Sequence, residues 1–153
     1  MVILTPVQPA NFGSETNKKN MMENQSKQTV IEFLTSVKAI DLEKIGQLLS
    51  PGVNWSQPGN NEISGLKRSQ QEVFGMVGKM FELSGNTLQL DAYHSISLNG
   101  NRVACLLHWM AEKPSGEKLD VYNIDIYTVE NGKICNVEIF SADQVQEDGF
   151  WKN

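Results

Sequence analysis

Asp125 is the residue of this sequence whose surroundings most directly suggest chemistry. It lies inside a run rich in apolar and β-branched residues, 121–129, and a second alternating run follows at residues 133–140. The step Asn131-Gly132 separates the two runs and predicts a hairpin with a type I′ loop, because both loop residues need positive φ. A carboxylate is therefore predicted in the middle of a strand that is otherwise suited to burial.

Counting from the predicted turn gives the partners of this carboxylate. Asp125 faces Glu138, and Asn123 faces Phe140, so these side chains share one side of the sheet. Facing carboxylates repel, so the pair is expected to be exposed, neutralised by a partner, or protonated on one member. In the last case Asp125, its pKa raised by burial and by Glu138, acts as a general acid or base or donates a hydrogen bond to a substrate carbonyl. In the other cases the two acids are solvated or ion-paired and carry no chemistry.

A second hairpin, predicted at Asn99-Gly100, supplies the next candidate, His94. The turn places His94 on an apolar side that it shares with Trp109. A lone histidine there is either a structural side chain of the core or an acid-base group in a pocket wall. The same turn places His108 opposite Asp91, either as an oriented acid-base pair or as an exposed pair of neighbours.

The connection at residues 113–116 decides which of these side chains meet Asp125. If the strands pair directly across this turn, Asp125 lies on a polar side with His108. A slip by one residue, or a bulge, puts Asp125 with His94 and Trp109 in a mostly apolar pocket instead. We favour the second arrangement, because ligand pockets are mostly apolar with a few convergent polar groups.

Three helices and a short strand precede the hairpins. Hydrophobic spacing, turn signals and Asp41 as a helix cap predict helices at 26–39, 41–50 and from Gly65 to residue 84, and strands at 53–58, 87–98, 101–112, 117–130 and 133–140. This order predicts an α+β fold in which helices cover one face of a curved sheet. We expect residues 1–24 to be a polar leader or arm without regular structure, residues 25–143 to form the domain, and residues 144–153 to be a C-terminal tail.

Composition limits the classes of partner. With 13 Lys and Arg against 18 Asp and Glu, the net charge of −5 and the lack of a basic stripe argue against nucleic acid. No apolar stretch approaches the roughly 20 residues that span a bilayer, and no segment resembles a signal peptide. Cys105 and Cys135 are expected to be free thiols, which suits the cytoplasm. We expect no metal and no cofactor, because no zinc-ligand spacing occurs.

At this point the residues resemble a known family. The order of elements resembles that of the nuclear transport factor 2-like superfamily, and within it the SnoaL-like polyketide cyclase group. The motifs that carry the resemblance are Asp125-x-Tyr127-x-Val129-x-Asn131-Gly132-Lys133-Ile134, Trp55-x-Gln57-Pro58 and Gly65. The resemblance implies a cone-shaped, cystatin-like α+β barrel with three N-terminal helices packed on a curved, mainly antiparallel sheet. It also implies a small-molecule pocket at the open end and, usually, a homodimer.

The family includes isomerases, cyclases, epoxide hydrolases and proteins that are not enzymes, so the fold alone assigns no activity. Asp125 matches the oxyanion Asp of ketosteroid isomerase, but Phe33 replaces its Tyr and Gln57 replaces its base. Asp125 also matches the Asp of limonene epoxide hydrolase, but Asn123 stands in place of the Arg, and Trp55 and Gln57 in place of Tyr and Asn. Neither mechanism is expected here.

Polyketide cyclases of the group use an Asp and a His, so either His94 or His108 could act with Asp125. The prediction is a protein that binds a small hydrophobic ligand in a homodimer, as an isomerase, cyclase or hydrolase. The alternative is a non-catalytic module that binds a ligand or a protein. The candidate acid-base residues are Asp125, Glu138 and His94, and the candidate ligand contacts are Phe33, Trp55, Gln57, Trp109, Asn123 and Phe140.

Overall fold

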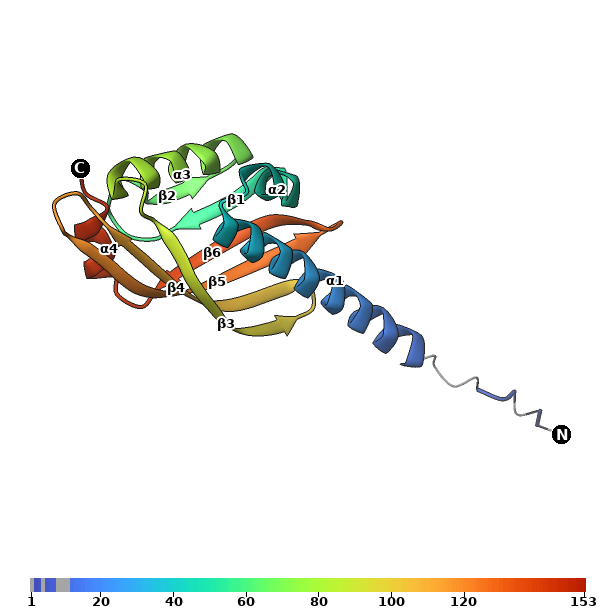
Figure 1. Ribbon diagram of the computed structural model, residues 1–153. Helices are drawn as coiled ribbons and strands as arrows, with labels where there is room; N and C mark the ends of the chain where they lie inside the picture. Colours follow the sequence, from blue (N-terminus) through green and yellow to red (C-terminus); the bar gives the residue numbers. More distant parts are fainter. Residues whose placement is uncertain (1, 4, 8–11) are drawn as a thin grey trace.

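One strongly curved sheet of six strands carries the fold (Figure 1). The computed structural model describes residues 2–3, 5–7 and 12–153. The strand order is β2-β1-β6-β5-β4-β3, and every neighbouring pair is antiparallel except β1 and β6. The mainly antiparallel sheet is as predicted. The strands are β1 (Leu49–Gln57), β2 (Gly65–Lys67), β3 (Gln89–Asn99), β4 (Arg102–Glu112), β5 (Lys118–Glu130) and β6 (Lys133–Ser141).

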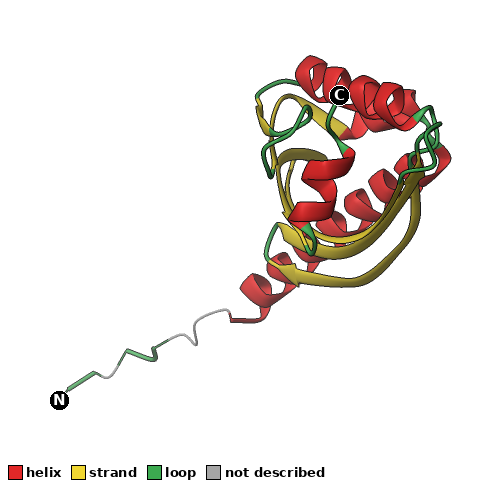
Figure 2. Cartoon of the chain, turned by 90° about the vertical axis from the view of Figure 1, so that its left-hand side faces the viewer, coloured by secondary structure: helices red, strands yellow, loops and turns green. Residues whose placement is uncertain are grey.

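Helices lie over the concave side of this sheet, so that sheet and helices together form a cone (Figure 2). The helix α1 contacts β3, β4 and β5, α3 contacts β1, and α4 contacts β5. Each apolar helix face is thereby buried against the inner face of the sheet, which is the α+β arrangement that the element order predicts. The helices are α1 (Phe12–Ala39), α2 (Leu42–Leu48), α3 (Gln70–Ser84) and α4 (Gln144–Phe150).

The helix ends follow local capping chemistry. The Asp41 side chain accepts a hydrogen bond from the Lys44 N–H at 3.1 Å and begins α2, as predicted. Gly85, with φ 64°, ends α3 in the left-handed conformation that a glycine adopts without strain. Asp143 caps α4 by accepting from the Gln146 N–H. The predicted start of the second helix and the predicted end of the third are therefore confirmed, but α2 ends at Leu48, not at residue 50, and β1 begins at Leu49, not at residue 53.

The prediction of an irregular leader is wrong for residues 12–24. They form the first turns of α1, which is 28 residues long and projects beyond the sheet (Figure 1). Polar composition suggested a loop, but the sequence has no proline between residues 10 and 50, so nothing interrupts the helix. Thr29 lies inside this helix, where its hydroxyl donates a hydrogen bond of 2.9 Å to the Gln25 carbonyl. Residues 1, 4 and 8–11 of the predicted leader lie outside the described residues.

Two other boundaries differ from the predictions. Residues from Gly65 to Lys67 pair with β1 as the short strand β2, and α3 begins only at Gln70. Leu66 therefore lies in a strand rather than in the predicted helix, and it is 49% exposed. The predicted tail, residues 144–153, contains the helix α4, because the side chain of Asp143 caps its first turn.

The hairpin of β5 and β6 has the predicted turn but a different register. Asn131 and Gly132 both have positive φ, as a type I′ loop requires. However, Cys135 is an extra residue on β6, so the pairing shifts by one and Asp125 lies opposite Ile139 rather than Glu138. A bulge of this kind re-aims every later side chain. The shift buries Val137 and Ile139 and turns the intervening side chains outward.

The hairpins that join β3 to β4 and β4 to β5 form another part of the wall. Bulges at Asp91 and Ser95 interrupt β3, and His94 pairs with Leu106 on the outer face, contrary to prediction. Between β4 and β5, Cys105 lies opposite Asp125. This is the slipped register that we favoured, and it brings Asp125 to the concave face.

Cys105 and Cys135 are free thiols. No helix in the described part of the chain is long and apolar enough to cross a membrane.

Candidate functional site

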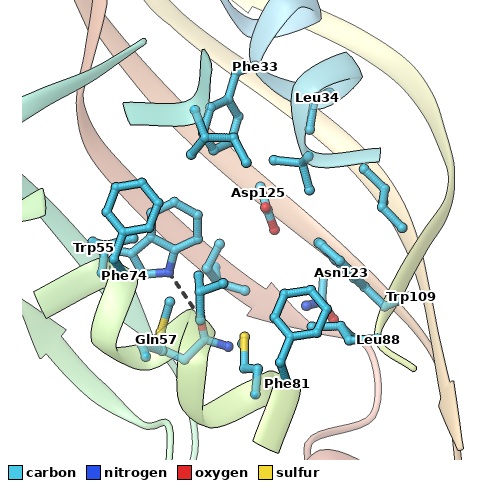
Figure 3. A pocket seen from close by; sticks show the side chains of 18 of the residues that line it. Phe33, Leu34, Trp55, Gln57, Phe74, Phe81, Leu88, Trp109, Asn123 and Asp125 are labelled. Atoms are coloured by element: carbon cyan, nitrogen blue, oxygen red, sulfur yellow. Dashed lines mark hydrogen bonds between the residues drawn. The ribbon is translucent and has the colours of Figure 1, made fainter. Parts of the chain in front are cut away.

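A cavity of about 110 Å³ lies between the concave face of the sheet and the helices (Figure 3). Its walls come from all four helices and from five of the six strands, and most of the lining side chains are apolar or aromatic. The polar exceptions are Gln57, Asn123, Asp125, Tyr127 and Glu147. A mostly apolar cavity with a few convergent polar groups is the usual form of a small-molecule site.

Asp125 lies in the wall of this cavity, below Phe33 and Leu34 in Figure 3. Its side chain is buried, with the residue only 3% exposed. The Tyr127 hydroxyl donates a hydrogen bond of 2.8 Å to Oδ2. The other oxygen, Oδ1, is buried and has no hydrogen-bond partner within the described part of the chain. One oxygen is thus held in place, while the other can still accept a hydrogen bond.

The surroundings of Asp125 change its acidity. Burial raises the pKa of its carboxyl group to about 7, the Tyr127 hydrogen bond acts against this rise, and the negative charge of Glu147 adds to it. Burial and Asp125 raise the pKa of the Cys105 thiol to about 12, so the thiol stays uncharged. The pKa of Tyr127 is raised well above its ordinary value for the same reasons, so its hydroxyl remains a neutral donor. Of these three groups, Asp125 is the one whose pKa lies near neutral pH.

Glu147 is a second buried acid, and the sequence interpretation missed it. It lies on α4, is 4% exposed and lines the cavity. Burial raises its pKa, while the polar groups of Ser141, Trp151 and Asn123 act against the rise. The signal was present in the sequence, because the Asp143 cap followed by residues 147, 150 and 151 has the spacing of one buried helix face.

Two amide side chains complete the polar part of the wall. Gln57 at the end of β1 is 7% exposed, and its Oε1 accepts a hydrogen bond from the Trp55 indole N–H at 3.0 Å (Figure 3). Asn123 lies two residues before Asp125 on β5 and is 4% exposed, and its Oδ1 has no partner among the described residues. Both amides can orient a ligand without changing its charge.

With this geometry established, comparison with known proteins identifies the family. Residues 30–137 match the SnoaL-like domain. The chain belongs to this family. A protein of unknown function with a cystatin-like fold from Xanthomonas campestris is 34% identical, with a TM-score of 0.80 over 84% of this chain and 98% of that one.

Two other solved structures share the fold of this SnoaL-like protein. TerC, co-crystallised with polyporic acid, is 17% identical with a TM-score of 0.71, over 81% of this chain and 97% of its own. A proposed SnoaL-like polyketide cyclase from Jannaschia sp. CCS1 is 15% identical with a TM-score of 0.67, over 79% of this chain and 88% of its own. At these identities the likeness concerns the fold alone.

The SnoaL-like chain brings most of the predicted site residues together. The structure places six of the nine in the lining of the cavity: Phe33, Trp55, Gln57, Trp109, Asn123 and Asp125. The other three lie elsewhere because of the bulges in β3 and β6. Glu138 pairs with Ile126 on the outer face and forms an ion pair with Arg102, Phe140 is 53% exposed, and His94 is exposed.

His108 also lies outside the cavity. Its Nδ1 is 2.9 Å from Asp91 Oδ2, its Nε2 contacts Asp120, and its ring stacks on Tyr122. The hydrogen bonds to Asp120 and then Asp91 raise the pKa of His108. The predicted contact with Asp91 therefore exists, but on the face of the sheet that points away from the ligand cavity. Among the described residues, no group of three or more His, Cys, Asp or Glu side chains is arranged to hold a metal ion.

Proposed function

We propose that this SnoaL-like protein binds one small, largely apolar molecule in the cavity and moves a proton on it through Asp125. The observation that carries the proposal is the free Oδ1 of Asp125, which is buried in an apolar wall and has no partner among the described residues. A buried polar atom without a partner costs about 1–3 kcal/mol, and functional sites are where such costs are retained.

Asp125 has a pKa suited to proton transfer near neutral pH. A general acid or base works best when its pKa is close to the working pH, and burial raises the pKa of Asp125 to about 7. Tyr127 fixes Oδ2, and Asp125 lines the cavity, so we assign the proton exchange to Oδ1, the oxygen without a partner among the described residues. Gln57 and Asn123 orient polar groups of the ligand, and the rings of Phe33 and Trp109 contact its apolar body. Isomerisation and cyclisation require only such a proton shuttle, and hydrolysis additionally requires water.

Non-catalytic binding is the second candidate. It is favoured by the absence of a histidine among the described lining residues, because the polyketide cyclases that the sequence resembles pair an Asp with a His. The family description is compatible with either function. The proposed cyclase from Jannaschia sp. CCS1 supports catalysis, and TerC with polyporic acid supports the binding of a small organic molecule by this fold.

A ligand screen tests whether the cavity is the binding site. Polyketide, terpenoid and steroid-like compounds are screened by thermal shift on the wild type and on Val77→Phe, which narrows the cavity from α3. The matched control is Gln71→Phe, which adds the same ring on the exposed side of α3. A ligand at 100 times its Kd stabilises by about 2.7 kcal/mol, so we expect a rise in Tm of several degrees for the wild type and the control but not for Val77→Phe. Equal stabilisation of all three proteins would contradict the proposal. Product analysis of each hit then separates an enzyme from a binder.

We further propose that two copies of the chain associate through the outer face of the sheet. Leu106, Ile124 and Phe140 form a row across β4, β5 and β6, and Ile124 and Phe140 are 48% and 53% exposed. Large apolar groups that lie together on an exposed face mark interaction surfaces, and an apolar patch is complementary to itself, as a twofold interface requires.

Sedimentation velocity tests this association. We expect the wild type to be a dimer at micromolar concentration and Phe140→Asp to be a monomer, because an unpaired buried charge at the interface is unfavourable. Val145→Asp is the control, since Val145 is 85% exposed on α4, away from the sheet. A wild type that sediments as a monomer would remove the proposal.

A further inference from the structure

The polar atoms left unpartnered in the cavity are mainly acceptors. Asp125 Oδ1, Asn123 Oδ1 and Glu147 Oε2 are all buried without a hydrogen-bond partner, and the three residues are only 3%, 4% and 4% exposed. Asn123 and Asp125 point to the same side of β5, and Glu147 is close enough to raise the pKa of Asp125. The one buried donor in the same group of described residues, the Trp151 indole N–H, acts on Glu147 and lowers its pKa, which leaves Asp125 Oδ1 and Asn123 Oδ1 as the acceptors most in need of a donor. A ligand that supplies hydrogen-bond donors would satisfy these acceptors.

The charge of the cavity has one sign. Its described lining contains the carboxyl groups of Asp125 and Glu147 and no lysine, arginine or histidine. An ionised carboxylate in an apolar wall is costly unless an opposite charge pairs with it. No side chain of the described lining provides that opposite charge. A carboxylate or phosphate on the ligand would increase the cost, whereas a cation would remove it.

The aromatic side chains of the cavity wall also favour a cationic ligand. Figure 3 shows rings from β1, α1, α3 and β4 around Asp125 and Asn123. An ammonium group is attracted to the faces of Trp and Phe rings within about 6 Å, and more strongly where water is excluded. The rings in the lining are Phe33, Trp55, Phe74, Phe81, Trp109, Tyr127 and Trp151.

We propose that the ligand is an apolar amine whose protonated nitrogen binds between Asp125, Asn123 and Glu147 and whose hydrophobic body lies against the aromatic wall. The proposal rests on the proposed function, since it assigns the chemical class of the molecule that enters the same cavity. It excludes ligands that present a carboxylate or phosphate to this end of the cavity.

Binding of such a ligand depends on pH in a defined direction. The groups that act on Asp125 are Tyr127 on β5, Cys105 on β4 and Glu147 on α4. An aliphatic ammonium stays protonated to about pH 10. As the pH rises through about 7, Asp125 ionises and the amine gains a full counter-ion, so its binding strengthens from pH 6 to pH 8. A neutral ligand lacks this gain.

Three compounds with one apolar body test the proposal: 4-phenylbutylamine, 4-phenylbutan-1-ol and 4-phenylbutanoate. All 3 tryptophans of the chain line the cavity, so quenching of tryptophan fluorescence reports binding directly. At pH 8 we expect the amine to bind at least about tenfold more tightly than the alcohol, since a hydrogen bond to a charged group contributes more than this ratio requires. The carboxylate is expected not to bind, and the advantage of the amine is expected to shrink at pH 6.

Two isosteric variants and one control complete the test. Asp125→Asn and Glu147→Gln should each reduce the advantage of the amine over the alcohol, whereas Asp120→Asn, on the outer face of the same strand as Asp125, should leave it unchanged. If the alcohol or the carboxylate binds as tightly as the amine, the amine proposal is overturned while a ligand-binding cavity remains. If none of the three binds, the amine proposal is also overturned, and the screen with Val77→Phe decides the proposed function separately.

Discussion

Replacing Asp125 by asparagine is expected to remove product formation and, at pH 8, to make the protein more stable. Loss of a general acid or base lowers turnover by about 10²–10⁴-fold. The gain in stability arises because burial raises the pKa of the folded Asp125 to about 7 from an ordinary value of 3.8. A difference of about three pKa units corresponds to an upper limit of about 4 kcal/mol in the free energy of unfolding. Asparagine keeps an oxygen that accepts the Tyr127 hydrogen bond and carries no charge.

The sign of the pH dependence follows from proton linkage. Between about pH 4 and pH 7 the folded wild type retains a proton on Asp125 that the unfolded chain has lost, so wild-type stability falls as the pH rises through this window. The Asp125→Asn variant lacks this slope. Urea denaturation of both proteins at pH 4.5 and pH 8 measures it, and Asp120→Asn controls for the removal of a carboxylate. Equal stabilities of the wild type and Asp125→Asn at pH 8 would contradict the burial of an ionisable Asp125.

Replacing Trp151 by alanine is expected to destabilise the protein by about 3–5 kcal/mol. Trp151 is 1% exposed and packs edge to face on Phe150, with ring centroids 4.8 Å apart. Its carbonyl also accepts a hydrogen bond from the Glu62 N–H, which ties the end of the chain to the loop between β1 and β2.

Urea denaturation again supplies the measurement, with Val145→Ala as the control. Val145 lies on the same helix but is 85% exposed, so its truncation should change stability by less than about 0.5 kcal/mol. Since Trp151 also lines the cavity, the alanine variant should weaken ligand binding as well. A small effect of Trp151→Ala would mean that α4 is not held against the barrel in solution.

Local signals predicted the parts of the fold that depend on few residues. The Asn131-Gly132 turn, the Asp41 cap and the end of α3 at Gly85 depend on the conformations of one or two residues each, and the structure has all three. The resemblance of the strand motifs to the SnoaL-like group was also sufficient to identify the family.

Strand register was predicted less well, because each pairing along a strand depends on all the pairings between it and the turn. The turn fixes only the first pairs of β5 and β6, and the extra residue Cys135 then shifts all the others. A bulge has no sequence signature comparable to an Asn-Gly turn, since it is selected by which side chains the finished core can bury. For this reason Glu138 and Phe140 were assigned to the cavity although they lie outside it, and His94 was misplaced in the same way by the bulges of β3.

Glu147 was missed for a different reason. Its burial depends on α4 folding back against the barrel, and that depends on contacts between residues far apart in the chain. The side chain of Asp148, for example, accepts hydrogen bonds from the backbone of Asn60 and the side chain of Asn61. The Asp143 cap and the spacing of residues 147, 150 and 151 indicate a helix with one buried face, but they do not indicate the surface against which that face packs.

The extra residue in β6 also limits how the ligand preference of this protein can evolve. Because side chains alternate between the two faces, loss of one residue from β6 would exchange Val137 and Ile139 with Glu138 and Phe140. Substitutions in this strand change either the cavity or the outer face, whereas insertions and deletions change both at once. Divergent relatives are therefore expected to differ in the composition of β6 more readily than in its length.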